Sequence, residues 1–278
     1  MDVLRYTAFS TSTDGGNPAG VVLDAAGASE AQMQRVAAEV GYSETAFLVD
    51  EEPGVVRVRY FSPLAEVPFC GHATIASAVA HAHRHGPGTV RFDTVAGAVS
   101  VSTAADDDGV LRATLVSVAP RTVALDAADQ VELLAALGWS GDDLDPALPP
   151  RVAFAGAWHP VLAAATRRRL ADLDYDFPRL SALMAARGWT TAALVHRLGA
   201  HEWAARNPFP PGGVVEDPAT GAAAAAFGGY LRELGLVEPP TSLTIRQGDD
   251  LGRPSVITVD IPVDGGIAVS GAAVPIPA

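Results

Sequence analysis

The sequence predicts an α+β protein of two similar lobes, each a curved, mixed β-sheet around a central helix. Two observations lead to this prediction. Short runs that are apolar, or that alternate between apolar and polar residues as strands do, occur along both halves of the chain. An Ala-rich segment of helical length opens at Cys70-Gly71-His72-Ala73-Thr74, and a second one opens at Asp217-Pro218-Ala219-Thr220-Gly221. A repeat of this kind is expected when two halves share one architecture.

In the first half, strand-like runs dominate and two helices interrupt them. One helix is expected between Ser29, which suits the N-cap, and Gly41, which suits the C-terminal end, and Gln32 completes a capping box with Ser29. A second helix is expected from about His72 to Gly86. The expected strands are residues 3–9, 21–23, 46–49, 55–61, 89–93, 98–103 and 111–118.

The second half repeats this theme. Its longest helix is expected from about Ala219 to Leu234, with Asp217 as the N-cap and Pro218 in the first turn. Shorter helices are expected at residues 131–137 and 180–187, and strands at 191–198, 202–207, 243–247, 256–261 and 267–272. We place the lobes at residues 1–118 and 119–278, and the last strand, near 267–274, is a candidate to complete the first lobe.

All 19 basic residues of the 278-residue chain are arginines, and this excludes several kinds of enzyme. Without a lysine, the chain cannot form a Schiff base with pyridoxal phosphate or with a carbonyl substrate. A Walker-A loop and the phosphate-binding lysine of protein kinases are excluded for the same reason. The hydrophobic fraction of 49% is high enough for a buried core and too high for a disordered chain.

The net charge of −13 limits the partners that the protein can have. A surface of this sign repels nucleic acid and anionic membranes, so we expect neither as a partner. The N-terminus has no basic start followed by an apolar core, and Ala-rich runs such as 222–226 are too short to span a bilayer. Cys70 is the only cysteine, so no internal disulfide can form, and a cytoplasmic location is expected.

Five short motifs occur in order along nearly the whole chain. They lie at residues 14–22 (Asp-Gly-Gly-Asn-Pro-Ala-Gly-Val-Val), 43–47 (Ser-Glu-Thr-Ala-Phe), 70–74, 216–221 (Glu-Asp-Pro-Ala-Thr-Gly) and 247–255 (Gln-Gly, then Gly-Arg-Pro-Ser). In this order and spacing, the chain resembles the PhzF-like phenazine biosynthesis family. The resemblance implies the diaminopimelate epimerase-like fold, in which each of two pseudo-symmetric lobes is a barrel-like sheet around a central helix.

Glu44 is the first candidate catalytic residue. It follows a Gly-Tyr-Ser turn and precedes the apolar run 46–49, so its carboxyl group can be partly removed from water. Desolvation favours the protonated form of a carboxyl group, and such a group can both take and give a proton. From the residues alone, Glu44 can also be an ordinary solvated acid in a turn. The resemblance implies that Glu44 is the general acid/base that moves a proton on the substrate.

His72 and Asp217 are the other two candidate catalytic residues. His72 would lie at a helix start, where free backbone N–H groups suit a carboxylate ligand and a neutral imidazole can donate a hydrogen bond. Asp217 would occupy the matching helix start of the second half. From the residues alone, His72 and Asp217 can each also be a residue that only caps its own helix. The resemblance implies that both lie in the active site with Glu44.

The resemblance also implies a set of substrate-binding positions. They are Asn17, Gly71, Ala73, Thr220, Gly221 and Ala222. Gly16, which precedes Asn17, suits a turn with a positive φ. Members of the family often have Ser where this chain has Ala222. A hydroxyl group that would bind substrate is therefore missing, and this leaves the native substrate open.

Cys70 is an alternative acid/base. Diaminopimelate epimerase uses one cysteine from each half, and this chain has only the first, which excludes a two-thiol racemase. A pair formed by Cys70 with Asp217 or Glu44 stays open, and so does a buried cysteine without chemistry. We expect no metal, because His81 and His85 have no evident third ligand. We also expect no nicotinamide or flavin, because no strand leads into Gly-x-Gly-x-x-Gly.

Together, the motifs lead us to expect a cofactor-independent isomerase with an active site between the lobes, where two helix N-termini would bind a small carboxylic acid. The type reaction implied by the resemblance is isomerisation of trans-2,3-dihydro-3-hydroxyanthranilate, and the same analogy implies a homodimer. Two alternatives stay open. One is an amino- or hydroxy-acid racemase or epimerase that uses Cys70, and the other is a non-catalytic protein of this fold that binds a small acid.

Overall fold

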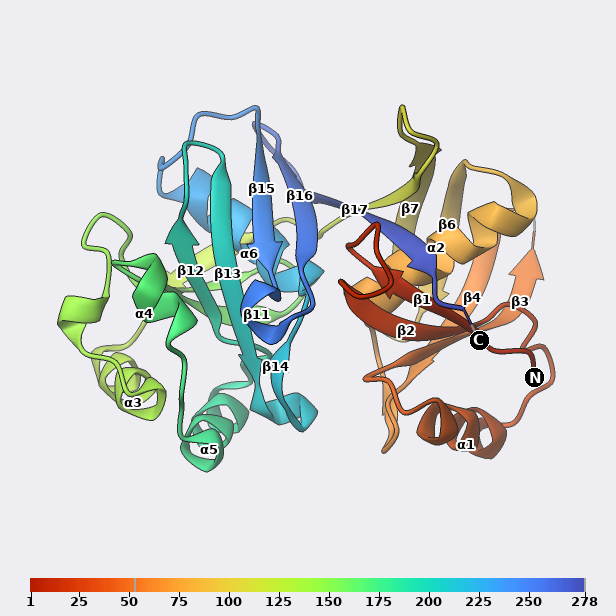
Figure 1. The fold of residues 1–278 in the computed structure, drawn as a ribbon, viewed down its shortest axis with the longest axis horizontal. Coiled ribbons are helices and arrows are strands. Elements are labelled where there is room, and N and C mark those ends of the chain that lie inside the picture. The colour runs from red at the N-terminus through yellow and green to blue at the C-terminus, as the bar shows by residue number, and fades with distance from the viewer. Residues whose placement is uncertain (53, 278) are drawn as a thin grey trace. The chain divides into compact units, whose positions relative to one another are not determined.

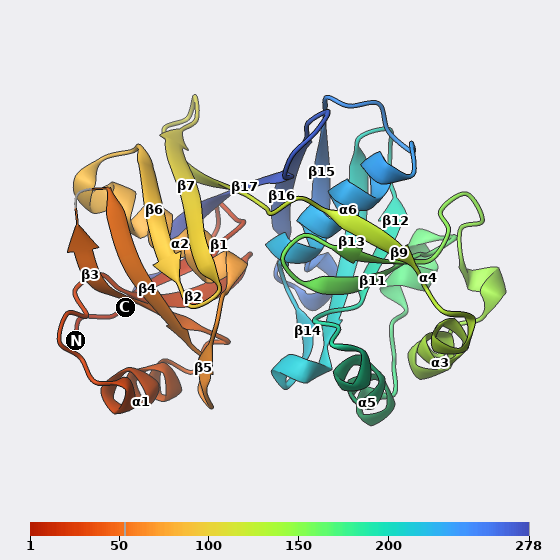
Figure 2. The ribbon, with the colours of Figure 1, turned by 180° about the vertical axis from the view of Figure 1, so that it is seen from behind.

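The computed structural model describes residues 1–52 and 54–277, which divide into two units. The first unit comprises Met1–Val116 together with the C-terminal segment from Ser270 onward, and the second comprises Ser117–Val269. Each unit has its own strands and its own central helix (Figure 1, Figure 2). The last strand of the chain, β17 (Ala268–Pro275), lies for most of its length in the first unit.

The sheet of the first unit closes into a barrel of eight strands. These are β1 (Leu4–Ala8), β2 (Asn17–Val22), β3 (Thr45–Glu52), β4 (Val55–Phe61), β6 (Thr89–Thr94), β7 (Gly97–Ala105), β8 (Leu111–Val116) and β17. They pair in this order, and β17 pairs with β1 to close the ring. The β2–β3 and β4–β6 pairs are parallel, and helices lie in the connections that such pairs require. The short β5 (Glu66–Val67) pairs with β4.

The helix α2 (Gly71–His85) lies inside this barrel (Figure 1). It contacts β1, β2, β3, β7 and β8. Ala73, Ala76, Ala78 and Ala80 are almost completely buried. A helix that is surrounded on all sides by an eight-stranded barrel needs small side chains, because the bore leaves little room beyond the helix itself. Packing therefore explains the Ala-rich composition of α2.

The helix predicted between Ser29 and Gly41 is confirmed as α1 (Glu30–Val40). Both halves of the Ser29–Gln32 capping box are present, and Gly41 ends the helix with a φ of 73°. Met33 and Ala37 are buried against β3 and β4, so that α1 covers one side of the barrel. Local signals alone suffice to define this helix.

The second unit contains a mixed sheet of seven strands. These are β9 (Arg121–Ala124), β10 (Arg151–Phe154), β11 (Trp158–Ala163), β12 (Ala193–Arg197), β13 (Glu202–Phe209), β15 (Thr241–Gln247) and β16 (Ser255–Ile261), paired in this order. The β14 strand (Val214–Asp217) pairs with the end of β13. The central helix α6 (Gly221–Glu233) contacts β9, β10, β11 and β16, so the sheet curves around it. The predicted α+β fold, with a curved mixed sheet around one helix in each lobe, is confirmed.

Three smaller helices pack on the face of this sheet that points away from α6. They are α3 (Ala127–Leu137), α4 (Arg167–Ala171) and α5 (Phe177–Arg187), and 3-10 turns lie at Gly141–Asp143, Pro210–Gly212 and Asp249–Leu251. Their buried leucines join a core cluster with Leu162 and Leu194 of the sheet. Among the described residues, no helix combines the length and the apolar composition that crossing a membrane requires.

The prediction for the start of α6 is wrong. The helix begins at Gly221 with Thr220 as its N-cap, whereas the sequence predicts a start near Ala219 with Asp217 as the cap. Asp217 instead ends strand β14, where it is opposite Asn207 of β13. The sequence also fails to predict β9, β10, β11 and β14, because these strands are short and Pro160 interrupts the pattern of β11.

Candidate active site

Glu44 lies in the first unit immediately before strand β3. The backbone N–H of Gly20 in β2 donates a hydrogen bond of 3.2 Å to the carbonyl oxygen of Glu44. This close approach depends on glycine, because a Cβ at position 20 would lie 2.6 Å from Oγ1 of Thr45. The parallel pairing of β2 with β3 therefore sets the position of the Glu44 backbone.

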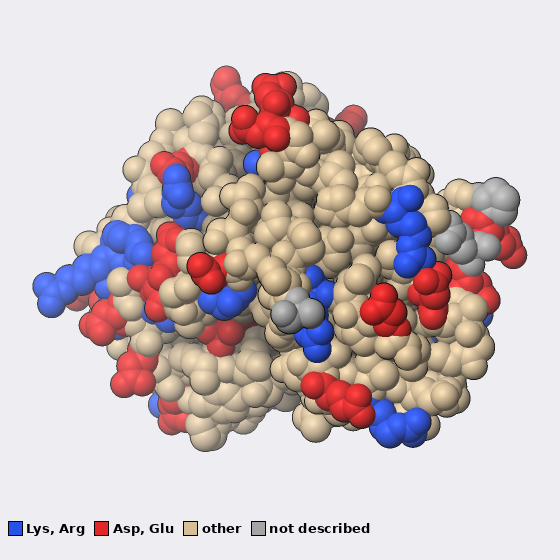
Figure 3. Space-filling view, turned by 45° about the vertical axis from the view of Figure 1, so that its right-hand side comes forward, with Lys and Arg blue, Asp and Glu red and all other residues tan. Residues whose placement is uncertain are grey.

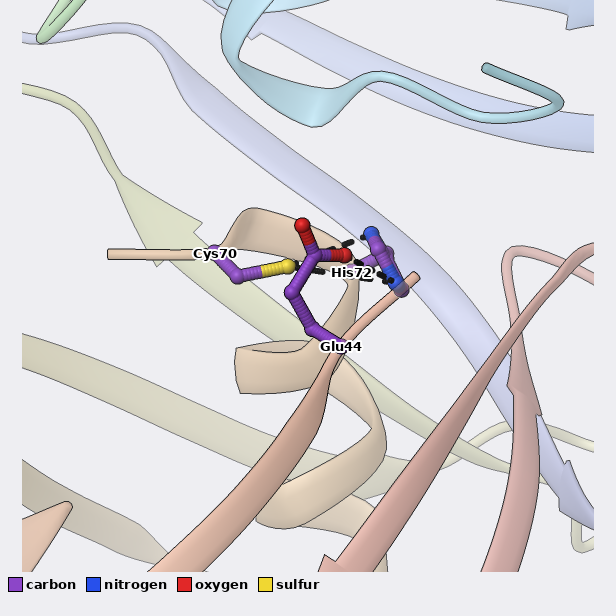
Figure 4. A group of neighbouring side chains, drawn as sticks. All are labelled: Glu44, Cys70 and His72. Carbon is purple, nitrogen blue, oxygen red and sulfur yellow. Dashed lines mark hydrogen bonds and ion pairs between the residues drawn. The ribbon is translucent and has the colours of Figure 1, made fainter. Parts of the chain in front are cut away.

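His72 lies in the first turn of α2 and faces Glu44 (Figure 4). Its Nε2 atom is 3.4 Å from Oε2 of Glu44, and the exposed fractions of the two side chains are 6% and 13%. Oγ of Ser43 is also 3.4 Å from Nε2 of His72. The structure thus brings together two of the three predicted catalytic residues, although they are far apart in the sequence.

Cys70 completes this group, and its sulfur lies on the same side of the imidazole ring as the Glu44 carboxylate (Figure 4). Its Sγ atom lies 3.3 Å from Nδ1 and 3.8 Å from Nε2 of His72. Cys70 is the N-cap residue of α2 and makes no capping hydrogen bond through its side chain. The set of Glu44, Cys70 and His72 offers three ligand atoms, all within 4.8 Å of one another, and thus contains the donors of a metal site.

The start of α2 is held in place by buried hydroxyl groups. Oγ1 of Thr74 donates a hydrogen bond of 2.6 Å to the carbonyl oxygen of Cys70. The hydroxyl of Tyr60 in β4 lies 2.7 Å from the same Thr74 oxygen, and burial raises the pKa of Tyr60. The predicted binding positions Gly71 and Ala73 flank His72 in this turn, where the first backbone N–H groups of a helix suit an anion.

The turn before β2 contains the next predicted position, Asn17. This residue is buried, begins β2 and is opposite Ala8 of β1. The preceding Gly16 has a φ of 69°, as its sequence predicts, and a Cβ there would lie 2.4 Å from the carbonyl oxygen of Ala8. Phe9, at the end of β1, has a φ of 64°, which is unusual for a residue with a bulky side chain. The backbone around Asn17 is therefore tightly constrained.

In the second unit, Asp217 and Thr220 form a buried hydrogen-bonded pair. The Thr220 hydroxyl donates a hydrogen bond of 2.6 Å to Oδ2 of Asp217. Gln247 of β15 links both residues, because its Nε2 donates to the Asp217 carbonyl at 2.6 Å and its Oε1 accepts from the Thr220 N–H at 3.1 Å. The predicted positions Gly221, which is buried, and Ala222, which is partly exposed, follow as the first residues of α6.

Gln247 is a residue of this network whose role sequence reasoning does not identify. The Gln-Gly motif at 247–248 contains a signal for it, because Gly248 has a φ of 80° and a Cβ there would lie 2.2 Å from the carbonyl oxygen of Arg253. The sharp turn after β15 thus brings the Gly252-Arg253-Pro254-Ser255 motif beside Pro218, whose carbonyl oxygen accepts a hydrogen bond from Ser255.

A second buried polar chain, His159–Thr191–Asn207, lies in the same unit. Nδ1 of His159 is 2.9 Å from Oγ1 of Thr191, whose hydroxyl donates to Oδ1 of Asn207 at 2.8 Å. Burial lowers the pKa of His159 to about 4, while a hydrogen bond to the Thr191 backbone acts in the opposite direction. Asn207 and Gln247 line the same small cavity beside α6. The sequence gives no signal for this chain, because its members come from three separate strands or loops.

Acidic and basic side chains both lie on the surface of the protein (Figure 3). On the face shown in Figure 3, basic side chains are scattered among acidic ones and form no continuous basic patch among the described residues.

Comparisons with known proteins identify the family. The model of the family described as phenazine biosynthesis-like protein matches residues 6–277. A protein of Deinococcus radiodurans described as an uncharacterized isomerase is 36% identical, over 94% of this chain and 87% of its own length. The trans-2,3-dihydro-3-hydroxyanthranilate isomerase of Pseudomonas chlororaphis is 32% identical, over 90% of this chain and 86% of its own length.

Solved structures lead to the same result. The crystal structure of the Bacillus anthracis phenazine biosynthesis protein of the PhzF family is similar with a TM-score of 0.88 at 25% identity, and the alignment covers 99% of this chain and 96% of that chain. The chain therefore belongs to the phenazine biosynthesis-like protein family, and it is an isomerase with the diaminopimelate epimerase-like fold.

Proposed function

We propose that the protein is a cofactor-independent isomerase in which Glu44 moves a proton on a small carboxylic acid. The observation that carries this proposal is the pairing of a mostly buried carboxylate with an imidazole at 3.4 Å, at the first turn of a central helix. Glu44 can accept a proton from carbon and return it. His72 can donate a hydrogen bond to the negative charge that develops on the substrate, in a site with little water.

The proposed reaction is an allylic proton shift. The Glu44 carboxylate removes a proton from one carbon, the electron pair of that C–H bond forms a new double bond, and the old double bond shifts to take up a proton at another carbon. The substrate is neither oxidised nor reduced, so the balance requires no redox cofactor. The backbone N–H groups at Gly71 and Ala73 would hold the substrate carboxylate.

The named relatives support a choice of substrate class. A relative with 32% identity acts, by its name, on trans-2,3-dihydro-3-hydroxyanthranilate, a small cyclic amino acid with a carboxylate and an allylic C–H bond. We propose this compound as the first substrate to test. Ala222 stands where the family often has Ser. A substrate that makes one hydrogen bond fewer to the protein at this position is therefore the next choice.

We also propose that Asp217, Thr220, Gly221 and Ala222 of the second unit, and Asn17 of the first, contact the substrate. The support is chemical: the Thr220 hydroxyl holds the Asp217 carboxylate and Gln247 holds the Asp217 backbone carbonyl, so the carboxylate is oriented before a substrate binds. Substitution of Asp217 with Asn should then raise KM or lower kcat for the same reaction that Glu44 is proposed to catalyse. A homodimer is proposed by family analogy, and sedimentation equilibrium tests it.

The decisive experiment is an NMR assay in D₂O with trans-2,3-dihydro-3-hydroxyanthranilate, in which the wild type is compared with Glu44→Gln. Loss of substrate with deuterium in the product, absent in the variant, supports proton transfer by Glu44. Deuterium-free product that still requires Glu44 means that one proton is carried internally. If neither protein reacts, this substrate is wrong and amino and hydroxy acids are tested next.

A second candidate function is racemisation or epimerisation through Cys70, which is favoured by the 3.3 Å distance from Sγ of Cys70 to Nδ1 of His72. An adjacent imidazole is what activates a thiol. Cys70→Ala abolishes a reaction in which the thiol carries the proton, whereas Glu44 isomerisation continues in that variant. A protein that only binds the acid would show binding unaffected by Glu44→Gln and no solvent exchange.

A further inference from the structure

The side chains of Glu44, Cys70 and His72 form a cluster that contains one carboxylate, one thiol and one imidazole (Figure 4). We propose that this cluster binds a single Zn²⁺ ion, and that the bound metal withdraws Glu44 from proton transfer. The binding itself is independent of the proposed function. The inhibition that would follow rests on the proposed role of Glu44.

The spacing of the ligand atoms supports a common metal ion. Zn–S bonds of about 2.3 Å and Zn–N and Zn–O bonds of about 2.0 Å, at tetrahedral angles, separate the ligand atoms by roughly 3.3–3.7 Å. In the protein, Nε2 of His72 is 3.4 Å from Oε2 of Glu44 and 3.8 Å from Sγ of Cys70. The remaining distance, from sulfur to the carboxylate, is at most 4.8 Å, and rotation of the Glu44 side chain would shorten it.

The chemistry of the donors selects the metal. A thiolate and an imidazole favour Zn²⁺ over Mg²⁺ and Ca²⁺, which prefer oxygen ligands. The thiolate of Cys70 and the carboxylate of Glu44 together carry two negative charges, which balance the ion. Binding releases one proton from the thiol. Three protein ligands would leave the fourth position for water or for the carboxylate of a substrate.

Burial favours the site as well. Cys70 and His72 are buried, and only 13% of the Glu44 side chain is exposed. The group therefore differs from the exposed acidic clusters that are common on protein surfaces and hold no ion. The positive end of the α2 helix dipole opposes a cation, but the two anionic ligands outweigh a helix end, which is equivalent to roughly half a charge.

The other histidine pair is a natural control. His81 and His85 lie one turn apart near the end of α2, with ring centroids 4.4 Å apart. Among the described residues, no third histidine, cysteine or carboxylate joins them in a group of ligand atoms within metal-binding distance. Their substitution should therefore leave the proposed site intact.

The test uses the full-length protein after removal of metal with EDTA, titrated first with Co²⁺ and then with Zn²⁺ against a chromogenic chelator. We expect one equivalent of Co²⁺ to give a near-ultraviolet sulfur-to-cobalt charge-transfer band that one equivalent of Zn²⁺ removes. Cys70→Ser should abolish the band and weaken Zn²⁺ binding by at least about 100-fold. Removal of a group that only hydrogen-bonds a metal ligand already weakens metal binding by about 10–100-fold, and loss of a ligand should cost more. The His81→Asn/His85→Asn double variant should bind as the wild type does.

Two results would overturn the proposal: the absence of the band in the wild type, or Zn²⁺ binding of equal strength in Cys70→Ser. If Cys70→Ser does not fold, protection of the wild-type thiol decides instead. Zn²⁺ should slow alkylation of Cys70 by N-ethylmaleimide, and an unchanged rate refutes the site. These measurements contain no substrate, so their outcome is separate from that of the isomerase assay. If the isomerase assay succeeds, Zn²⁺ should inhibit the reaction, Mg²⁺ should not, and EDTA should restore it.

Discussion

Oε2 of Glu44 and Nε2 of His72 lie 3.4 Å apart, at the point where a barrel strand and the helix inside that barrel both begin. The first unit alone creates this pair, because β3 belongs to the ring of strands that encloses α2. The proposed general acid/base and the proposed hydrogen-bond donor are thus held by rigid elements, as precise proton transfer requires.

The first prediction concerns His72. His72→Asn should lower kcat/KM for the proton-transfer reaction by roughly 100- to 1,000-fold, the effect expected when a donor to a developing negative charge is lost. Ser43→Ala is the matched control, because Ser43 contacts the same imidazole nitrogen at 3.4 Å from a more exposed position. We expect its effect to stay below about tenfold, in line with a neutral hydrogen bond. Steady-state kinetics measure both, and equal losses in the two variants would contradict the role of His72.

The second prediction concerns the buried pair in the second unit. Thr220→Val removes the donor to Asp217 and leaves Nε2 of Gln247 with one partner fewer. The free energy of unfolding should fall by about 1–3 kcal/mol, the range for a buried polar group that loses its partner. Thr220→Ser keeps the hydroxyl and should lose less than half as much. Urea denaturation at neutral pH checks this, and a Ser variant as unstable as the Val variant would show that packing of the methyl group dominates.

The third prediction concerns acid stability. In the unfolded chain a histidine takes up a proton near pH 6.5, whereas burial lowers the pKa of folded His159 to about 4. The unfolded state therefore binds more protons between these two pH values. The free energy of unfolding should fall as the pH is lowered from about 6.5 to 4, by up to about 3 kcal/mol from this residue.

His159→Gln removes this titration. The variant should be less stable at pH 7, because it disturbs the hydrogen bond to Thr191, but its stability should fall less steeply between pH 6.5 and 4. His201→Gln at an exposed position serves as the control and should keep the wild-type slope. Denaturant titrations at several pH values measure the slopes. An unchanged slope in His159→Gln would mean that another group controls acid unfolding.

The fourth prediction concerns the contact between β2 and β3. Gly20→Ala places a methyl group 2.6 Å from Oγ1 and 2.8 Å from Cγ2 of Thr45, so the strands must separate. We expect a loss of about 1–3 kcal/mol in stability, as for an overpacked core. Activity should also fall, because the hydrogen bond from Gly20 to Glu44 is disturbed. Adding Thr45→Ala removes both clashing atoms and should restore most of the stability, and simple additivity of the two changes would refute this account.

Some elements of this fold can be predicted from the sequence because the signals lie within a few residues. The capping box of Ser29 with Gln32, and Gly41 at the other end, define α1 without reference to the rest of the chain. The Ala-rich segments likewise reveal both central helices. These are local preferences that tertiary packing reinforces.

Other features could not be predicted because distant residues decide them. Asp217 before Pro218 has the pattern of an N-cap, but pairing of β14 with β13 holds it in a strand, and Thr220 and Gln247 occupy its polar groups. The proximity of Cys70 to Glu44 follows from barrel closure, which no local pattern reports. The family motifs mark Glu44 and His72 as important, and only the fold explains why they meet.

The position of β17 has a consequence for synthesis of the chain. The barrel of the first unit closes only when β17, which follows the second unit along the chain, pairs with β1, whereas the second unit is a continuous segment. On the ribosome, the first half of the chain therefore emerges with β1 and β8 as open edges, and it stays incomplete until the second unit and β17 have been translated. The second half can fold as soon as it emerges. A chain truncated before Ala268 would therefore keep most of the second unit and leave the barrel of the first unit open between β1 and β8.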